Sequence, residues 1–173
     1  MYKRQLLKDQ IPQGYSHDYF IHLVGRIDRS AEEYYPFFKK NEERFSRMPI
    51  EKASLITRRI LSSVDYVFTK KRRLSNFLYL HSQLKEKNML NFSTSDIRGP
   101  MVYPFFVKGE NLRKWLIKNK VYVACYWVDI LGRVPEDSVE GMMAKYLVPL
   151  PIDQRYGTDE MTKILNVIND FNR

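Results

Sequence analysis

The sequence predicts an α+β fold, with a helical N-terminal half followed by a small, mainly antiparallel sheet of three strands and helices packed on it. Between residues 49 and 88, apolar side chains recur every three or four residues, the spacing of amphipathic helices. After residue 100, three short apolar runs are rich in β-branched and aromatic residues, namely MVYPFFV, VYVACYW and YLVPLPI. The polar stretch NFSTSDIRGP separates the two patterns and marks a boundary.

The first two predicted helices are identified by their starting residues. Ser30 is a suitable N-cap for a helix over residues 30–44, although Pro36 has to lie in the first turn or break this helix. Pro49 suits the first position of a second helix, which an apolar face extends over residues 50–63.

A third, longer helix is predicted before the boundary. Its apolar stripe runs from residue 70 to about residue 88, and either Asp65 or Thr69 is expected to cap it. This helix has the clearest amphipathic pattern in the first half of the chain.

The second half alternates the three predicted strands with short helices. Pro104 lies inside MVYPFFV and predicts that this strand has an unpaired outer edge, because proline cannot donate a backbone hydrogen bond. Helices are predicted over residues 109–119 and 136–145. Thr158 is expected to cap a terminal helix whose acidic first turn complements the helix dipole.

Composition narrows the environment of the chain. No apolar run approaches the ~20 residues needed to cross a bilayer. The single cysteine, Cys125, cannot form an internal disulfide and lies in an apolar run, so a buried, inert thiol is expected. These features favour a soluble protein of the cytoplasm.

The net charge of +9 raises the possibility of a polyanion partner. The densest basic cluster, residues 70–73, is KKRR, and its simpler interpretation is a solvated helix start. No RNA-module, zinc-finger or helix-turn-helix pattern accompanies it, so nucleic-acid binding is not favoured. The three histidines have no partners at metal-ligand spacing, so no metal site is predicted.

Several strings of the chain resemble one enzyme family. PMVYPFFV, ENLRKWLIKNKVYVACYW and YLVPLPIDQRYGTDEMTKILNVI, in this order, resemble the C-terminal small domain of the DegT/DnrJ-type sugar aminotransferases, which are pyridoxal-phosphate enzymes of fold type I. RMPIEKASLITRRIL is similar to the family's Arg-Met-Ser-Glu segment, and RRLSNFLYLHSQL to its Arg-Arg-x-Asn helix. The resemblance covers the chain from about Arg44 to the end, and its specificity lies in the order and spacing of these strings.

The resemblance implies an activity, a cofactor and partners. The family transfers an amino group to a nucleotide-linked keto sugar in surface-polysaccharide (lipopolysaccharide or O-antigen) biosynthesis, with pyridoxal 5'-phosphate as cofactor and a homodimer as the intact enzyme. The family's serine-to-lysine stretch ending in a glycine run is not found in these 173 residues. The chain is therefore interpreted as a C-terminal fragment that is inactive alone and does not bind the cofactor. Lys8 is a weak candidate for the Schiff-base lysine, and a solvated surface lysine is the simpler interpretation.

The resemblance also implies a division of the chain. Residues 1–5, MYKRQ, resemble the translation of a sequencing adapter and are interpreted as a scar. Residues 6–48 are the expected remnant of the large domain, 49–88 the interdomain helices, and 89–173 the small α/β domain. Two alternatives remain open: a non-catalytic α+β binding or adaptor module with a basic face, and a pseudo-aminotransferase that has lost its lysine.

One candidate cofactor-binding residue follows from the resemblance. Arg47 matches the arginine of the family's Asn-Tyr-Arg-Met segment, which lies near the partner subunit's cofactor phosphate. The asparagine of that segment is replaced by Phe45, which puts its phosphate contact in doubt. A surface ion pair is the alternative role for Arg47.

Five candidate substrate-binding residues lie at the end of the second predicted strand or in the loop after the third. Tyr126 and Trp127 fall where related sequences often place a histidine near the substrate, and core packing of the two rings is the alternative. Asp153, Arg155 and Tyr156 occupy the loop after the last strand, where grouped polar residues often bind ligands. A turn contact between Asp153 and Arg155 is the alternative interpretation of that pair.

Overall fold

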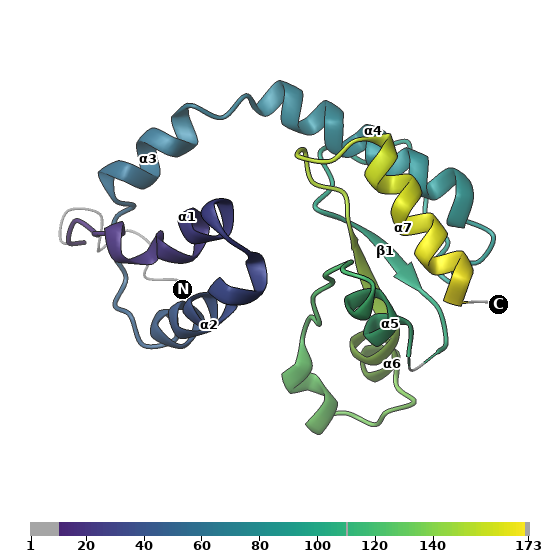
Figure 1. Ribbon diagram of the computed structural model, residues 1–173. Helices are drawn as coiled ribbons and strands as arrows, with labels where there is room; N and C mark the ends of the chain where they lie inside the picture. The colour runs from purple at the N-terminus through teal and green to yellow at the C-terminus, as the bar shows by residue number, and fades with distance from the viewer. Residues whose placement is uncertain (1–10, 110, 172–173) are drawn as a thin grey trace. The chain divides into compact units, whose positions relative to one another are not determined.

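The computed structural model describes residues 11–109 and 111–171, which form an α+β fold of seven α-helices and a two-stranded antiparallel sheet (Figure 1). The predicted class is therefore confirmed. The chain divides into two compact units, the first ending at Val64 and the second beginning at Asp65. This division lies within the range 49–88 predicted as interdomain helices, whereas the main boundary was predicted after Asn88. The interpretation of residues 1–5 and the role considered for Lys8 lie outside the described residues.

The first unit contains a short 3-10 helix, His17–Tyr19, and three α-helices: α1 (Ile21–Asp28), α2 (Ala31–Phe45) and α3 (Leu55–Ser62). As predicted, the Ser30 side chain caps α2 by accepting a hydrogen bond from the Glu33 amide, at 3.1 Å.

Helix α2 continues through Pro36, which was expected to lie in the first turn or to break the helix. A proline at this position costs one backbone hydrogen bond, but packing on both sides favours continuation. On either side of Pro36, the ring of Tyr34 stacks on that of Phe37 at a centroid distance of 5.4 Å, and the ring of Tyr35 stacks on that of Phe38 at 6.0 Å. Tyr34 also lies directly against Gly25 of α1, where an added Cβ would come within 2.0 Å of the ring.

Helix α3 begins later than predicted, at Leu55 instead of residue 50, and Pro49 is not its first residue. Ser54 is the actual N-cap and accepts a hydrogen bond from the Thr57 amide at 3.1 Å. The preceding residues are held outside the helix because Lys52 forms an isolated parallel bridge, with its amide bonded to the Pro12 carbonyl at 2.9 Å.

The second unit opens with α4 (Tyr66–Leu84), which corresponds to the long predicted helix. Of the two expected caps, Asp65 is the one used, and it accepts from the Phe68 amide at 2.9 Å. The terminal helix, α7 (Thr158–Phe171), has Thr158 as its first helical residue instead of its cap, while Glu160 accepts from the Gly157 amide.

The sheet consists of β1 (Val102–Phe106) and β2 (Leu147–Pro151), paired antiparallel with Tyr103 opposite Leu150. Helices α5 (Leu112–Lys118) and α6 (Val139–Tyr146) and a 3-10 helix, Val128–Gly132, lie between the two strands in sequence.

The third predicted strand, VYVACYW, is not a strand in the structure, where residues 121–127 have no ladder partner. The register gives the physical reason. In an antiparallel pair, alternate residues bond to the partner strand, and Pro149 and Pro151 must take the outward positions because they have no amide hydrogen. The outer edge of β2 therefore offers carbonyl oxygens with few amides, and a strand beside it cannot form a full ladder. In this unpaired segment Cys125 is exposed, which corrects the expectation of a buried thiol.

The outer edge of β1 is not paired with another strand either, as Pro104 predicts. The side chain of Asn88 takes the place of a strand: its amide nitrogen donates to the Pro104 carbonyl at 2.8 Å, and its oxygen accepts from the Phe106 amide at 3.0 Å. The Met89 amide bonds to the Phe106 carbonyl at 2.9 Å. Asn88 and Met89 thus cover the outer edge of β1, while in the described ranges the outer edge of β2 has no strand partner.

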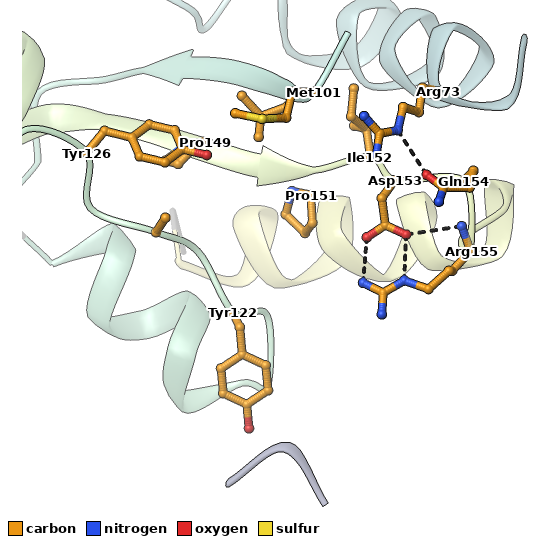
Figure 2. Close-up of a pocket in the computed structure, with 12 residues that line it drawn as sticks. Arg73, Met101, Tyr122, Tyr126, Pro149, Pro151, Ile152, Asp153, Gln154 and Arg155 are labelled. Carbon is orange, nitrogen blue, oxygen red and sulfur yellow. Dashed lines mark hydrogen bonds and ion pairs between the residues drawn. The ribbon is translucent and has the colours of Figure 1, made fainter. Parts of the chain in front are cut away.

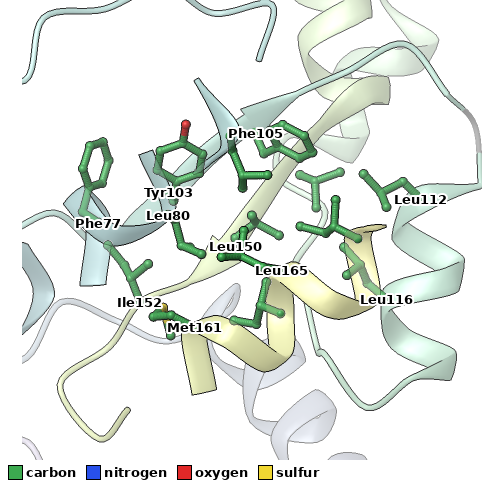
Figure 3. Close-up of a cluster of buried hydrophobic side chains, with 14 residues drawn as sticks. Phe77, Leu80, Tyr103, Phe105, Leu112, Leu116, Leu150, Ile152, Met161 and Leu165 are labelled. Carbon is green, nitrogen blue, oxygen red and sulfur yellow. The ribbon is translucent and has the colours of Figure 1, made fainter. Parts of the chain in front are cut away.

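The hydrophobic core lies entirely in the second unit (Figure 3). Tyr103 and Phe105 of β1 face it together with Val148 and Leu150 of β2, and α4, α5 and α7 cover this face of the sheet. The remaining core residues are Phe77, Leu80, Leu84, Leu112, Leu116, Ile152, Met161, Ile164, Leu165 and Ile168. Across the described ranges, no helix is sufficiently long and apolar to cross a membrane.

Candidate functional site

The second unit contains a hollow of about 400 Å³ on the sheet face opposite the core, beside the outer edge of β2 (Figure 2). Side chains alternate along a strand, so Val102, Pro149 and Pro151 share this face while the core residues occupy the other. Its volume falls within the range of small-molecule pockets. The lining residues are Arg73, Met101, Val102, Tyr122, Ala124, Tyr126, Pro149, Pro151, Ile152, Asp153, Gln154 and Arg155.

The loop from β2 to α7 forms one wall of the hollow, and Asn76 of α4 holds it in place. Asn76 is 1% exposed, and its side-chain nitrogen donates to the carbonyls of Ile152, Asp153 and Tyr156 at 3.0–3.3 Å. One turn earlier on the same helix, Arg73 Nε donates to Gln154 Oε1 at 3.0 Å. Two residues of α4 therefore fix the path of the loop.

Asp153 and Arg155 form a two-pronged ion pair at the mouth of the hollow. Arg155 Nε lies 2.8 Å from Asp153 Oδ1 and Arg155 Nη2 lies 2.9 Å from Oδ2, while the Arg155 amide also donates to Oδ1 at 3.1 Å. This is the turn contact considered above as the alternative for the pair. It does not withdraw either residue from the hollow, because both still line it.

The charges around Asp153 favour its ionised form. Burial raises the pKa of this carboxyl, but hydrogen bonds from the Arg155 side chain and amide, with the charges of Arg155 and Arg73, outweigh burial and hold the pKa below its usual range. The same side-chain hydrogen bond raises the pKa of Arg155. With two guanidinium groups and one carboxylate, the described lining carries a net positive charge.

The opposite wall is apolar and aromatic. Tyr126 lies beside Pro149 in Figure 2, and Tyr122 lies further along the same segment. Trp127 does not line the hollow: its backbone is left-handed, at φ 54°, and its side chain is 58% exposed with the ring edge-on to that of Tyr126. Neither the Tyr126 ring nor the Trp127 ring belongs to the core, so the alternative interpretation, that this pair packs in the core, is wrong.

The other two candidates lie elsewhere. Tyr156 packs against the core cluster, and the guanidinium of Arg155 lies over its ring at 5.4 Å from the centroid. Arg47 belongs to the first unit, where its side chain is exposed just after α2 and its amide bonds to the Arg44 carbonyl. Phe45, in the position of the family's asparagine, stacks on Tyr19 at 5.2 Å. The structure thus brings together Tyr126, Asp153 and Arg155.

A second hollow, of about 340 Å³, lies in the first unit and is mostly apolar. Its hydroxyl groups bond to one another: Ser16 to Ser54, and Ser54 to Thr57 at 3.0 Å. These hydroxyls are therefore occupied with holding α3 to the preceding segment.

Sequence reasoning missed Arg73 and Asn76. The sequence presents Arg73 as part of a basic cluster on the helix surface, yet it is half-buried and lines the hollow. Asn76 lies between the apolar residues of a buried helix face, and a polar residue in such a position needs hydrogen-bond partners. The sequence therefore indicates that Asn76 needs hydrogen-bond partners, but it does not identify them.

The lining residues do not fit pyridoxal phosphate. No lysine amine lines the hollow, and the carboxylate of Asp153 is bonded to Arg155 and not free to pair with a pyridinium nitrogen. In the ranges that the structure describes, no group of three or more metal-ligating side chains is found. The hollow is therefore suited to holding a ligand through charge, backbone carbonyls and aromatic faces.

No known protein family, curated protein or solved structure matches this chain. A function is accordingly inferred from its residues and their geometry.

Proposed function

We propose that this chain is the interdomain-helix and small-domain part of a pyridoxal-phosphate-dependent aminotransferase of fold type I that acts on a nucleotide-linked keto sugar in surface-polysaccharide biosynthesis. The cofactor and its lysine are held by residues other than those described here, and the intact enzyme is a cytoplasmic homodimer. On this proposal the chain alone is inactive, and its contribution is to close one side of the substrate site.

The observation that carries the proposal is the hollow beside β2. Three of the candidate substrate-binding residues, Tyr126 from the resemblance and Asp153 and Arg155 from their loop position, line it although they come from two segments separated by 27 or more positions in sequence. The resemblance treats the Arg-Arg-x-Asn helix and the LPIDQRYG string as separate elements. In the structure the side chain of Asn76, in the Arg-Arg-x-Asn helix, donates hydrogen bonds to backbone carbonyls of the LPIDQRYG string. This contact supports the proposal that the helix and the string form one site.

The test is an amino-transfer assay on protein expressed from the complete reading frame. The frame should supply a lysine-bearing domain upstream of this chain, and the protein should transfer the amino group of L-glutamate or another amino donor to members of a panel of nucleotide-linked keto sugars. Replacement of Tyr126 by alanine should lower the rate with the sugar nucleotide while leaving cofactor content unchanged. A complete reading frame with no additional domain would contradict the proposal.

The rival function is polyanion binding by the basic face of α4. Lys70, Lys71 and Arg72 are exposed in its first two turns, which favours electrostatic contact with phosphates. That function predicts salt-sensitive binding of heparin or RNA that falls when these three residues are neutralised together. A pseudo-aminotransferase, the third possibility, predicts an upstream domain that has the fold and lacks the lysine.

A further inference from the structure

We infer that Arg73 is the anion-binding residue of the hollow beside β2 and that this hollow holds a phosphorylated sugar, with the phosphate on Arg73 and the sugar hydroxyls on the proline carbonyls of β2. The ligand class rests on the proposed function. The assignment of Arg73 and of the strand edge rests on the structure alone.

Arg73 is placed to bind an anion. Its Nε is fixed by Gln154, and among the described residues none accepts a hydrogen bond from either terminal guanidinium nitrogen. Its charge lowers the pKa of Asp153, but the two side chains form no ion pair. Arg73 is thus held in one orientation by its Nε with its two remaining nitrogens available, which is the arrangement for a bidentate contact with phosphate or carboxylate.

The neighbouring cations do not compete for this role. Arg155 is neutralised by its two contacts with Asp153. Arg72 is exposed, lies over the ring of Phe68 at 5.5 Å and does not line the hollow. Arg73 is therefore the guanidinium of the described lining whose charge is not already paired.

The strand edge selects hydrogen-bond donors. Pro149 and Pro151 direct their carbonyls outward and have no amide hydrogen, and no described residue donates to either carbonyl. This edge can accept hydrogen bonds but cannot supply them at these two positions, so it does not suit an added β-strand. A sugar carries several hydroxyl donors, and the Asp153 carboxylate adds a further acceptor beside them.

The remaining walls suit a sugar ring. The side chains of Tyr126 and Pro149 both line the hollow and supply apolar surface, against which the C–H groups of a pyranose can pack. A simple anion needs neither this apolar surface nor the acceptor edge. The combination of one unpaired guanidinium, an acceptor edge and apolar surface favours a phosphorylated sugar over a free anion.

The test is calorimetric titration of the full chain with UDP-glucose at physiological ionic strength, with pyrophosphate and glucose as separate probes. The unsubstituted chain should bind UDP-glucose saturably and more tightly than either probe alone. Arg73→Gln should weaken binding at least about tenfold, whereas Arg72→Gln, which removes the same charge one residue away, should change it less than about twofold.

Backbone amide shifts on titration provide a second readout that does not depend on any variant. UDP-glucose should shift amides of residues 122–126 and 153–155. Equal weakening by the two substitutions, tighter binding of pyrophosphate alone, or no saturable binding would overturn the inference. If the protein from the complete reading frame contains cofactor but Arg73→Gln does not weaken its binding of UDP-glucose, this inference alone is contradicted. If that protein contains no cofactor but still binds UDP-glucose through Arg73, the proposed function alone is contradicted.

Discussion

Individual polar residues shape the candidate site more than its apolar lining does. Asn76 is buried within a helix face that otherwise carries core side chains, and its single amide group meets three loop carbonyls. Loop geometry of this kind depends on contacts about 76–80 residues apart in sequence. Local patterns therefore indicate that Asn76 needs partners but cannot identify them.

Replacing Asn76 with alanine should lower the free energy of unfolding by about 2–3 kcal/mol, because it leaves buried carbonyls without a donor. Chemical denaturation followed by circular dichroism measures the change. Asn169→Ala is the matched control, since Asn169 is exposed and its side-chain oxygen accepts from the exposed Lys87 amine at 3.2 Å; its effect should stay within about 0.5 kcal/mol. Equal effects of the two substitutions would mean that the Asn76 contacts do not hold the loop.

The Asp153–Arg155 pair should make stability depend on pH in a defined direction. The folded-state pKa of Asp153 is below its unfolded value, so its stabilisation is fully present above the unfolded pKa, near 4, and is lost as the pH falls through the folded pKa. Because the Arg155 side chain is 63% exposed, the contribution is about 0.5–1 kcal/mol.

Denaturation of the original chain and of Asp153→Asn at a series of pH values measures this contribution. The two proteins should differ at pH 6 and converge as the pH falls through the folded-state pKa of Asp153, which lies below its unfolded value. A difference that stays constant over this range would show that ionisation of Asp153 is not its source.

At the scale of secondary structure, sequence patterns predict helices more accurately than their ends. Ser30 is the cap that the sequence predicts, and Asp65 is one of the two predicted alternatives for α4; each combines a cap-forming side chain with an apolar stripe that follows. The predicted start of α3 at residue 50 is wrong. Ser54 and Pro49 are both suitable starting residues for this helix, and the bridge formed by Lys52 favours a start after Ser54. An N-terminal proline is permissive for a helix start but does not require one.

The prediction of a strand at VYVACYW is wrong, and the sequence of the neighbouring strand, β2, gives the reason. VYVACYW has the composition of a strand, yet pairing depends on both partners, and prolines at alternate positions of β2 remove the donors from the edge it would use. Strand composition alone does not show which edge a neighbour presents.

Replacing Pro149 and Pro151 together with valine should restore two edge donors and allow residues 121–126 to pair with β2. Amide hydrogen exchange in this segment should be fast in the original chain and should slow at alternate residues in the variant. The matched control is Pro104→Val, which adds a donor at the other edge of the sheet. Slowing in the control, or unchanged exchange in the double variant, would contradict the explanation from the proline edge.

At the scale of the whole molecule, the two units differ in how much they bury. Every buried hydrophobic side chain in the described ranges lies between Phe77 and Ile168, in the second unit. The first unit keeps many apolar side chains at the surface, including Leu55, Ile56, Ile60 and Leu61 of α3 at 44–63% exposure. Composition indicates enough apolar residues for one core but does not reveal that they are divided unevenly.

Residues 65–173 expressed alone should therefore unfold in one cooperative transition, whereas residues 1–64 alone should show none. Thermal and urea denaturation followed by circular dichroism provide the measurement. A fragment of residues 65–173 without a cooperative transition would show that the core depends on the first unit.

The cofactor content of protein expressed from the complete reading frame tests the proposed function most directly. About one pyridoxal phosphate per chain is expected, detected by its visible absorbance, held by a lysine outside the described residues and lost when that lysine is replaced by alanine. Protein that is folded and dimeric but binds no pyridoxal phosphate would contradict the assignment of this chain to an aminotransferase.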